Sequence, residues 1–203
     1  MKKLDILEVL KESLSLALKN ILSLIGAVLL WIITIWIPYI NVGTTIAIMT
    51  IPLELSKGQI INPTFIFDAK YRKRMGEVFI LWALIYAAVI AGTLFLFIPG
   101  IVISFAFSMA IYILLDHNVN PLQAIKLSND YTYGNKWRMF FIGLLVGLTI
   151  GVISGVLTFI LGRFIIVNAI ITMILMLVSM SWSLSINAIF YRELVSANAV
   201  AVE

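Results

Sequence analysis

The sequence predicts an all-α, polytopic membrane protein with six transmembrane helices, arranged as three tight hairpins with interfacial amphipathic helices on the cytoplasmic face. Two observations predict this fold class. The chain of 203 residues is 62% hydrophobic and only 12% charged, whereas a soluble domain carries about 25% charged residues. In addition, several runs without Asp, Glu, Lys or Arg exceed the roughly 20 residues that cross a bilayer as a helix. These runs are 20–53, 78–115, 139–162 and 164–191.

The N-terminal part is expected to form an amphipathic helix in residues 1–20, followed by the first hairpin in residues 21–56. In the amphipathic helix, polar side chains recur at helical spacing opposite leucines and isoleucines. These polar residues are Asp5, Glu8, Glu12, Ser15 and Lys19. The run that follows is too long for one crossing, and WIPYINVG interrupts it with Pro38, Asn41 and Gly43. Because such residues break helices, a tight turn is predicted there.

The second hairpin is expected in residues 77–115, after an interfacial helix in residues 62–75. This interfacial helix opens with Asn62-Pro63, and asparagine as cap before a proline at the first helical position is a start signal. Pro99-Gly100 is predicted to form the turn of the hairpin, because proline presets one turn dihedral and glycine tolerates the next.

The third hairpin is expected in residues 138–190, broken at Gly162-Arg163. It follows an interfacial helix in residues 120–133 that opens with Asn120-Pro121, where Gln123 is placed to complete a capping box. Each hairpin thus follows a short helix at the inner surface, and we hypothesise three repeats of this unit within a single membrane domain, residues 1–203.

The basic residues predict the orientation. All but one of the 14 lysines and arginines fall on the same side of the six-span arrangement, and Arg163 is the exception. Positive residues concentrate in cytoplasmic loops, so both termini and both long connections are expected in the cytoplasm. The protein is then expected in the cell membrane, plasma or inner, with outer connections too short for an external domain.

The composition argues against several kinds of chemistry. The chain has no cysteine and one histidine, which excludes disulfides and a histidine-rich metal site within one chain, so no metal or other cofactor is expected. Asp116 and His117, near Ser128 and Asp130, have side chains that could form a catalytic group. A polar connection between spans explains them better, since no catalytic motif accompanies them. We therefore expect a protein that is not an enzyme.

The middle of the chain carries a resemblance. IPGIVISFAFSMAIYILLD, followed by PLQAIKLSNDYTYGNKWRMFFIGLL, contains a Pro-Gly pair, Tyr-x-x-x-Asp (Tyr112, Asp116), Ala-Ile-Lys-x-Ser (Ala124 to Ser128) and Gly-x-Lys-Trp (Gly134 to Trp137). In these features the chain resembles uncharacterised bacterial and archaeal six-span membrane proteins, and is similar to the membrane domain of glycerophosphoryl diester phosphodiesterases. The resemblance implies a six-helix membrane module. The phosphodiesterase barrel is absent, so the hydrolytic activity is not implied.

A stripe of glycines marks the fifth predicted span. Gly143, Gly147, Gly151 and Gly155 recur every fourth residue, so they share one helix face on which another backbone can approach closely. The favoured interpretation is packing within the chain, against the alanine face of the third span formed by Ala83, Ala87 and Ala91. A contact between copies of the chain is the next interpretation, and a pore-lining face is the last.

Two basic clusters are candidate lipid-headgroup sites, because positive side chains beside a span attract anionic lipids. Their residues are Lys70, Arg72, Lys73, Arg74, Lys136, Trp137 and Arg138. The sixth span is partly polar, and a solute path along it would use Asn168, Ser181, Ser185 and Asn187. Serines in membrane helices more often bond to their own helix or bridge to a neighbour.

The leading functional hypothesis is a non-catalytic integral membrane protein that engages lipids or membrane partners. The alternative is a passive carrier or channel for a small solute or lipid, and an interfacial membrane enzyme is a distant third. The absence of charged residues at the bilayer centre argues against ion-coupled transport. Expected partners are membrane lipids, with a second copy of the chain or another membrane protein as alternatives. Nucleic acid is not expected.

Overall fold

The computed structural model describes residues 3–58 and 60–197, and within them all regular secondary structure is helical, with no strand. The predicted all-α class is confirmed. In chain order the elements are α1 (Ile6–Thr34), α2 (Ile40–Met49), α3 (Ile51–Ser56), the 3₁₀ turn η1 (Pro63–Phe67), α4 (Ala69–Lys73), α5 (Met75–Phe95), α6 (Phe97–Phe107), α7 (Ala110–Asp116), α8 (Pro121–Thr132), α9 (Lys136–Leu161), α10 (Ile165–Tyr191) and the π-helical η2 (Arg192–Ser196).

Five helices of the described chain are long and apolar enough to cross a membrane: α1, α5, α6 together with α7, α9, and α10 continued through η2. These helices characterise a multi-pass membrane protein. The expected sixth span is not among them. Its segment is divided into α2 and α3, and the 10 residues of α2 rise only about 15 Å, against a hydrocarbon core of about 30 Å.

The expected boundary between an amphipathic helix and a first span is not present, because α1 is one continuous helix. Asp5 caps it by accepting hydrogen bonds from the backbone N–H groups of Leu7 and Glu8. Asn20, at the expected boundary, donates to the Leu16 carbonyl oxygen (3.2 Å) and accepts from Ile61 N–H (3.0 Å). Its polar side chain therefore joins the helix to the connection after α3 and leaves the helix unbroken.

The first hairpin turns between α1 and α2 and then bends at Thr50. Tyr39 adopts a left-handed backbone with φ of 70°, and Asn41 closes the turn by donating to the Ile35 carbonyl oxygen (3.1 Å). At the bend, the Thr50 hydroxyl donates to the Ile46 carbonyl oxygen (2.9 Å), and Pro52 lies in the first turn of α3. Proline has no N–H to continue the preceding helix, so α2 ends here.

The second hairpin turns three residues earlier than predicted. The reversal lies at Leu96, whose backbone is extended, and Pro99-Gly100 lie inside the first turn of α6. Proline is tolerated there because the first N–H groups of a helix have no intrahelical acceptor. Gly100 serves packing, since a Cβ at this position would lie 3.0 Å from the Thr93 Cα and would collide with the Thr93 hydroxyl. The dipeptide therefore permits close contact between α5 and α6 and does not form the turn.

A break divides α6 from α7 near the middle of their shared span, and α8 satisfies the backbone groups that the break leaves free. The Ser128 hydroxyl donates to the Ala106 carbonyl oxygen (2.7 Å) and accepts from Met109 N–H (3.2 Å). Thr132, one turn further along α8, lies 3.4 Å from the same carbonyl oxygen. Ala124, Ser128 and Thr132 form the buried face of α8, so this helix packs against the break and does not only rest at a membrane surface.

The predicted helix caps at the two long connections are confirmed. Asn62 accepts from Thr64 N–H (3.1 Å) at the start of η1, and Asn120 accepts from Gln123 N–H (2.9 Å) at the start of α8. The elements that follow differ, however. The first connection forms η1 and α4, the second forms the single helix α8, and α1 has no separate surface helix. The hypothesised threefold repeat is therefore not visible at the level of helices.

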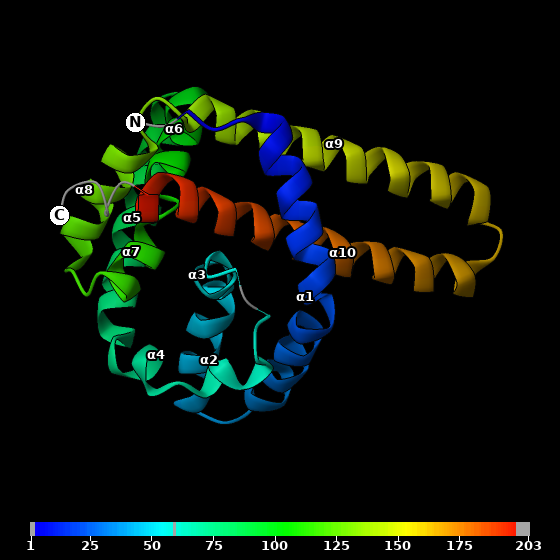
Figure 1. Ribbon diagram of the computed structural model, residues 1–203, viewed down its shortest axis with the longest axis horizontal. Coiled ribbons are helices and arrows are strands. Elements are labelled where there is room, and N and C mark those ends of the chain that lie inside the picture. The colour runs from blue at the N-terminus through cyan, green and yellow to red at the C-terminus, as the bar shows by residue number, and fades with distance from the viewer. Residues whose placement is uncertain (1–2, 59, 198–203) are drawn as a thin grey trace.

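The third hairpin, α9 and α10, projects from the rest of the molecule. The two helices run side by side past α1 and away from α5 to α8 (Figure 1). The residues of both helices are mostly apolar, and few of the residues in either span are buried. Apolar side chains at the tip are largely exposed, for example Phe159, Phe164 and Ile165.

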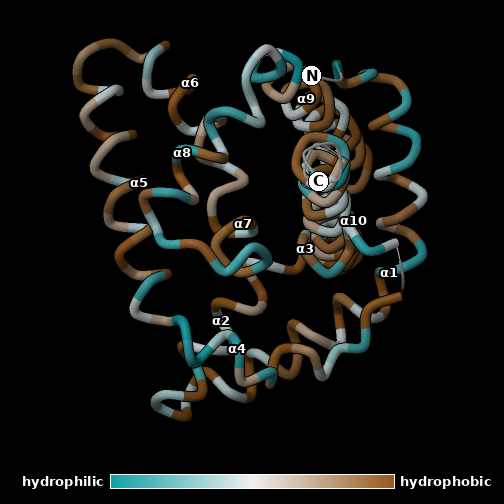
Figure 2. Tube along the Cα trace, turned by 60° about the vertical axis from the view of Figure 1, so that its left-hand side comes forward, coloured by the Kyte–Doolittle hydropathy of each residue, from teal (hydrophilic) through white to brown (hydrophobic). Residues whose placement is uncertain are grey.

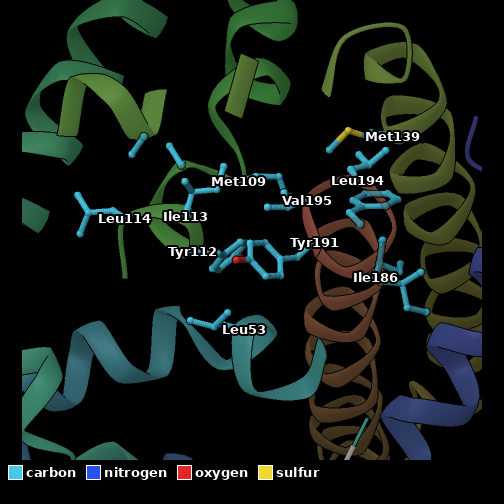
Figure 3. Close-up of a cluster of buried hydrophobic side chains, with 14 of the residues drawn as sticks. Leu53, Met109, Tyr112, Ile113, Leu114, Met139, Ile186, Tyr191, Leu194 and Val195 are labelled. Atoms are coloured by element: carbon cyan, nitrogen blue, oxygen red, sulfur yellow. The ribbon is translucent and has the colours of Figure 1, made fainter. Parts of the chain in front are cut away.

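The main core lies where α7, α8 and the end of α10 meet. Tyr112 and Tyr191 face each other edge to face, with ring centroids 5.8 Å apart (Figure 3). The Tyr191 hydroxyl donates to the Asp116 carboxylate (2.5 Å). At the same end, Arg192 binds both carboxylate oxygens of Glu12 (2.7 and 2.6 Å), which joins α10 to α1. The base of the projecting hairpin is thereby fixed to both halves of the chain.

Candidate functional site

A groove of about 510 Å³ lies between α9 and α10, along Met139 to Ile150 of α9 and Ser179 to Phe190 of α10. These segments, at the end of the hairpin nearest the core, are called its basal halves. Glycines and apolar residues of α9 form one wall, α10 contributes a mixed polar and apolar wall, and Phe105 of α6 also lines the groove. The lining residues are Phe105, Met139, Gly143, Val146, Gly147, Ile150, Ser179, Met180, Ser183, Ile186, Asn187 and Phe190. The α9 wall runs from Met139 to Ile150, which is about 16 Å of helix and close to half of the hydrocarbon core.

The glycine stripe produces this groove and does not pack against the chain. A Cβ built at Gly143, Gly147, Gly151 or Gly155 meets no atom within 4 Å. The favoured interpretation, packing against Ala83, Ala87 and Ala91, is wrong, because these alanines of α5 are themselves exposed. Gly143 and Gly147 line the groove, whereas Gly151 and Gly155 do not. The stripe therefore has a basal half on the groove and a distal half on the open face of α9.

The polar residues of α10 lie on two different faces. Ser181 and Ser185 are buried, and the Ser181 hydroxyl donates to the Ala17 carbonyl oxygen of α1 (3.1 Å). The Ser185 hydroxyl donates to the Ser181 carbonyl oxygen (2.9 Å). Ser181 therefore joins α10 to α1, Ser185 bonds within α10, and neither residue lines the groove. Asn187 does line the groove, on the other face.

Asn168 lies near the hairpin tip, far along α10 from the groove. Its Oδ1 is buried and has no hydrogen-bond partner among the described residues. The structure thus divides the predicted path among three places: the α1 contact, the groove and the hairpin tip.

Two groove residues, Ser179 and Ser183, were not predicted as site residues. The available signal was their spacing, because 179, 183 and 187 follow each other by four residues and so share one helix face. The Ser179 hydroxyl donates to the Met176 carbonyl oxygen (2.9 Å), and the Asn187 amide donates to the Ser183 carbonyl oxygen (3.0 Å). The polar edge of the groove thus runs for about 12 Å along α10.

The first predicted headgroup cluster mostly makes contacts within the protein. Lys70 pairs with Glu54 (2.8 Å), and the Arg72 guanidinium donates to the Phe67 carbonyl oxygen (3.2 Å). Arg74 pairs with Glu77 and donates to the carbonyl oxygens of Leu114 (2.6 Å) and Val119 (2.8 Å) and to the side chain of Asn118 (2.7 Å). Arg74 thereby caps the C-terminal end of α7. Lys73 is exposed, and it is the member of this cluster that best suits a lipid headgroup.

Glu54 forms ion pairs with two lysines near the first cluster. Lys57 (2.6 Å) and Lys70 (2.8 Å) both contact its carboxylate. Burial acts to raise the pKa of Glu54, but the hydrogen bonds from Lys57 and Lys70 outweigh it and hold the pKa below its usual value. Glu54 lies in α3, outside the five candidate spans, so the pairing stabilises a connection between spans.

The second predicted headgroup cluster begins α9. Lys136 donates to the Asn129 side chain (2.7 Å), and the Arg138 guanidinium donates to the Leu4 carbonyl oxygen. Leu4 N–H in turn donates to the Asn135 side chain (3.0 Å), so this cluster holds the start of the chain. Trp137 remains 53% exposed. The two clusters lie apart, the first around α4 and the second at the base of α9 (Figures 1 and 2).

Ser128, Asp116 and His117, from the candidate catalytic group, do not come together as one site. Ser128 is fully buried and its hydroxyl serves the backbone at the α6–α7 break. Asp116 accepts from Tyr191 (2.5 Å), and His117 lies 4.0 Å from Asp116. Among the described residues, no group of three or more His, Cys, Asp or Glu side chains could hold a metal ion.

Comparison of the chain with protein families, with curated proteins and with solved structures found no match. The class of this protein therefore follows from the structure itself: an all-helical, multi-pass membrane protein with an open groove between two of its spanning helices.

Proposed function

We propose that this protein is a non-catalytic membrane protein that engages lipids, and that it holds a lipid chain in the groove between α9 and α10. The groove itself is the observation that supports this function. It has about 510 Å³ of space, within the range of small-molecule sites, and it extends over about one leaflet of a bilayer.

The surroundings of the groove favour a lipid as occupant. α9 and α10 are candidate membrane spans, so the molecules next to an open groove between them are lipid chains. Water is a poor occupant, because each buried water needs two to four polar partners. Most of the lining side chains are apolar and offer none. A flexible acyl chain fits an apolar surface of irregular shape without such partners.

The passive carrier is the less favoured alternative. A solute path needs polar groups along a continuous route, and two of the expected path residues, Ser181 and Ser185, are buried and bonded to backbone carbonyl oxygens. The hypothesis of an interfacial enzyme has less support, since the Ser128 hydroxyl is bound to backbone groups at the break between α6 and α7.

The proposed setting is the cell membrane, with both termini in the cytoplasm. The support is the distribution of basic residues, of which only Arg163 lies at the tip of the α9–α10 hairpin. Positive residues favour the cytoplasmic side, so the base of the groove, next to Arg138 and Arg192, faces the inner leaflet in this proposal. Membrane lipids are the proposed partners.

Native mass spectrometry of the full chain, released gently from nanodiscs of a bacterial polar lipid extract, tests the proposal. The double variant Gly143→Leu/Gly147→Leu fills the groove, and we expect it to lose lipid that the unmodified protein retains. The matched control is Gly151→Leu/Gly155→Leu, which adds the same side chains to the same stripe outside the groove.

Retention of lipid by the unmodified protein and the control, but not by the groove variant, supports the proposal. Equal retention by all three proteins contradicts it, as does the absence of any retained lipid. All four glycines have open space beside them, so both variants are expected to fold, which circular dichroism checks.

A further inference from the structure

We infer that the groove selects lipids whose chains are joined through carbonyl groups, as in esters and amides, over lipids with ether-linked chains. The inference rests on the proposed lipid-holding function and concerns the chemistry of the linkage. Ser183 and Asn187 carry it, because both line the groove and both have hydrogen-bond donors directed at no other group of the described chain.

The hydrogen bonds of Ser183 and Asn187 leave each residue with a free donor. The Asn187 amide nitrogen donates one N–H to the Ser183 carbonyl oxygen (3.0 Å). That bond fixes the amide orientation, since a carbonyl oxygen accepts only from the NH₂ group. The second N–H of the amide has no hydrogen-bond partner among the described residues. The Ser183 hydroxyl is likewise recorded without an acceptor within residues 3–58 and 60–197, and its side chain is exposed on the groove.

Ser179 provides a contrast on the same helix face. Its hydroxyl already donates to the Met176 carbonyl oxygen (2.9 Å), so its only donor is used. The groove therefore offers donors at Ser183 and Asn187, and at Ser179 only an acceptor. A ligand that matches this pattern brings acceptors to the part of the groove nearer its base.

The depth of these donors corresponds to the linkage region of a lipid. Asn187 lies five residues from Arg192, or about 7 Å along the helix, and Ser183 lies about 6 Å deeper. The headgroup layer is about 5–7 Å thick on each side of the hydrocarbon core. In this proposal Arg192, which pairs with Glu12, lies at headgroup level. Asn187 then lies at the level of the carbonyl linkages, and Ser183 lies one helical turn deeper, where it meets the carbonyl group of a chain that enters the groove.

Carbonyl and ether oxygens differ in what they can accept from these donors. A carbonyl oxygen is a strong acceptor in the plane of its group, whereas an ether oxygen is a weaker acceptor that the adjoining chains crowd. In a site away from water, a donor without an acceptor is unfavourable. A lipid with acyl linkages satisfies Ser183 and Asn187, and its ether analogue leaves them without strong acceptors.

The test uses nanodiscs that contain equal amounts of a diacyl phosphatidylglycerol and its dialkyl ether analogue with the same chain lengths. Native mass spectrometry distinguishes the two retained lipids by mass. We expect the unmodified protein to retain the diacyl lipid in preference, by about fivefold for each hydrogen bond formed. Ser183→Ala and Asn187→Leu should each reduce the preference by about that factor. Ser179→Ala, the matched control, should leave it unchanged.

The outcomes separate this inference from the proposed function. Equal retention of both lipids by the unmodified protein overturns the inference, while the loss of lipid in Gly143→Leu/Gly147→Leu would still support lipid holding. A preference that persists in both Ser183→Ala and Asn187→Leu, or that disappears in Ser179→Ala, also overturns it. If no lipid of either kind is retained, both proposals fail. Ser183→Ala alone suffices if Asn187→Leu does not fold, because alanine is well tolerated in a helix.

Discussion

Replacing Ser128 with alanine tests whether α8 stabilises the break between α6 and α7. In an unbroken helix, Met109 N–H would donate to the Phe105 carbonyl oxygen. In this chain it donates to the Ser128 hydroxyl (3.2 Å), while that hydroxyl donates to the Ala106 carbonyl oxygen (2.7 Å). Ser128→Ala removes one oxygen atom and leaves both backbone groups in a fully buried position.

The magnitude follows from the two groups that lose a partner. Each buried donor or acceptor left unsatisfied costs about 1–3 kcal/mol. Thr132, 3.4 Å from the Ala106 oxygen, retains part of one interaction. Alanine is also the better helix former, by a few tenths of a kcal/mol. We therefore expect Ser128→Ala to lower the free energy of unfolding by about 2–4 kcal/mol.

Equilibrium unfolding in mixed micelles with a denaturing detergent, followed by the fluorescence of the five tryptophans, measures this free energy. Ser179→Ala is the matched control, because its hydroxyl donates to a carbonyl oxygen of its own helix. This control should change the free energy by less than about 0.5 kcal/mol. If Ser128→Ala is no more destabilising than Ser179→Ala, the backbone at the break does not depend on α8, and the reasoning fails.

Three further predictions concern the connections between helices. Arg74→Ala should lower the free energy of unfolding by about 2–4 kcal/mol in the same titration, because a charged side chain that binds the Leu114 and Val119 carbonyl oxygens is lost. Arg74→Lys should retain only part of the lost free energy of unfolding, since lysine lacks the planar guanidinium group. Full stability of Arg74→Lys would contradict the capping role. Gly100→Ala should disrupt the contact of α5 with α6, because the new Cβ would lie 3.0 Å from Thr93 Cα. Gly76→Ala, with no atom within 4 Å, should be neutral or slightly stabilising; equal thermal stability of the two variants would refute the close approach. Finally, the lowered folded-state pKa of Glu54 means that its stabilising contribution is present above about pH 4.5 and is lost as pH falls through the lowered value. Glu54→Gln should therefore flatten the pH dependence of stability below about pH 4.5, and an unchanged pH profile would exclude Glu54 as its source.

The helices and their starting points were predictable because their signals are local. Charge-free runs of sufficient length identify apolar helices, and an asparagine followed by proline identifies a helix start at Asn62 and at Asn120. These features depend on residues within one or two turns of each other. The continuity of α1 was not predicted, because the polar residue at the expected boundary, Asn20, contacts Ile61, which lies 41 residues away.

The turn of the second hairpin shows how one local pattern can serve two structures. Pro-Gly is suited to a β-turn, and proline is equally suited to the first turn of a helix. The choice between them depends on Thr93, whose approach to Gly100 requires a residue without a side chain. That contact joins two helices, so no reading of the dipeptide alone could decide it.

The groove was predictable only in parts. The sequence shows which residues share a face of α9 or α10, but it does not show which face meets another helix. Ser181 and Ser185 were expected on a path because they are polar, but both are buried, and Ser181 instead bonds to α1. Ser179, Ser183 and Asn187 form an equally regular face, and the structure places this one opposite the basal glycines. Two polar faces on one membrane helix are therefore explained by two different neighbours.

The groove does not explain why glycine occupies positions 151 and 155. Each glycine in a helix interior costs about 1 kcal/mol relative to alanine, and Gly151 and Gly155 gain no compensating contact within the described chain, since a Cβ at either would meet nothing within 4 Å. Any compensation must come from outside the described residues, through lipids or through another helix in the membrane. Alanine at these two positions separates the cases: alanine should stabilise α9 if only fluid lipid covers the stripe, and should weaken assembly if a helix packs closely there. The same substitution at Gly143 and Gly147 would narrow the groove, so the two halves of one stripe are expected to respond differently.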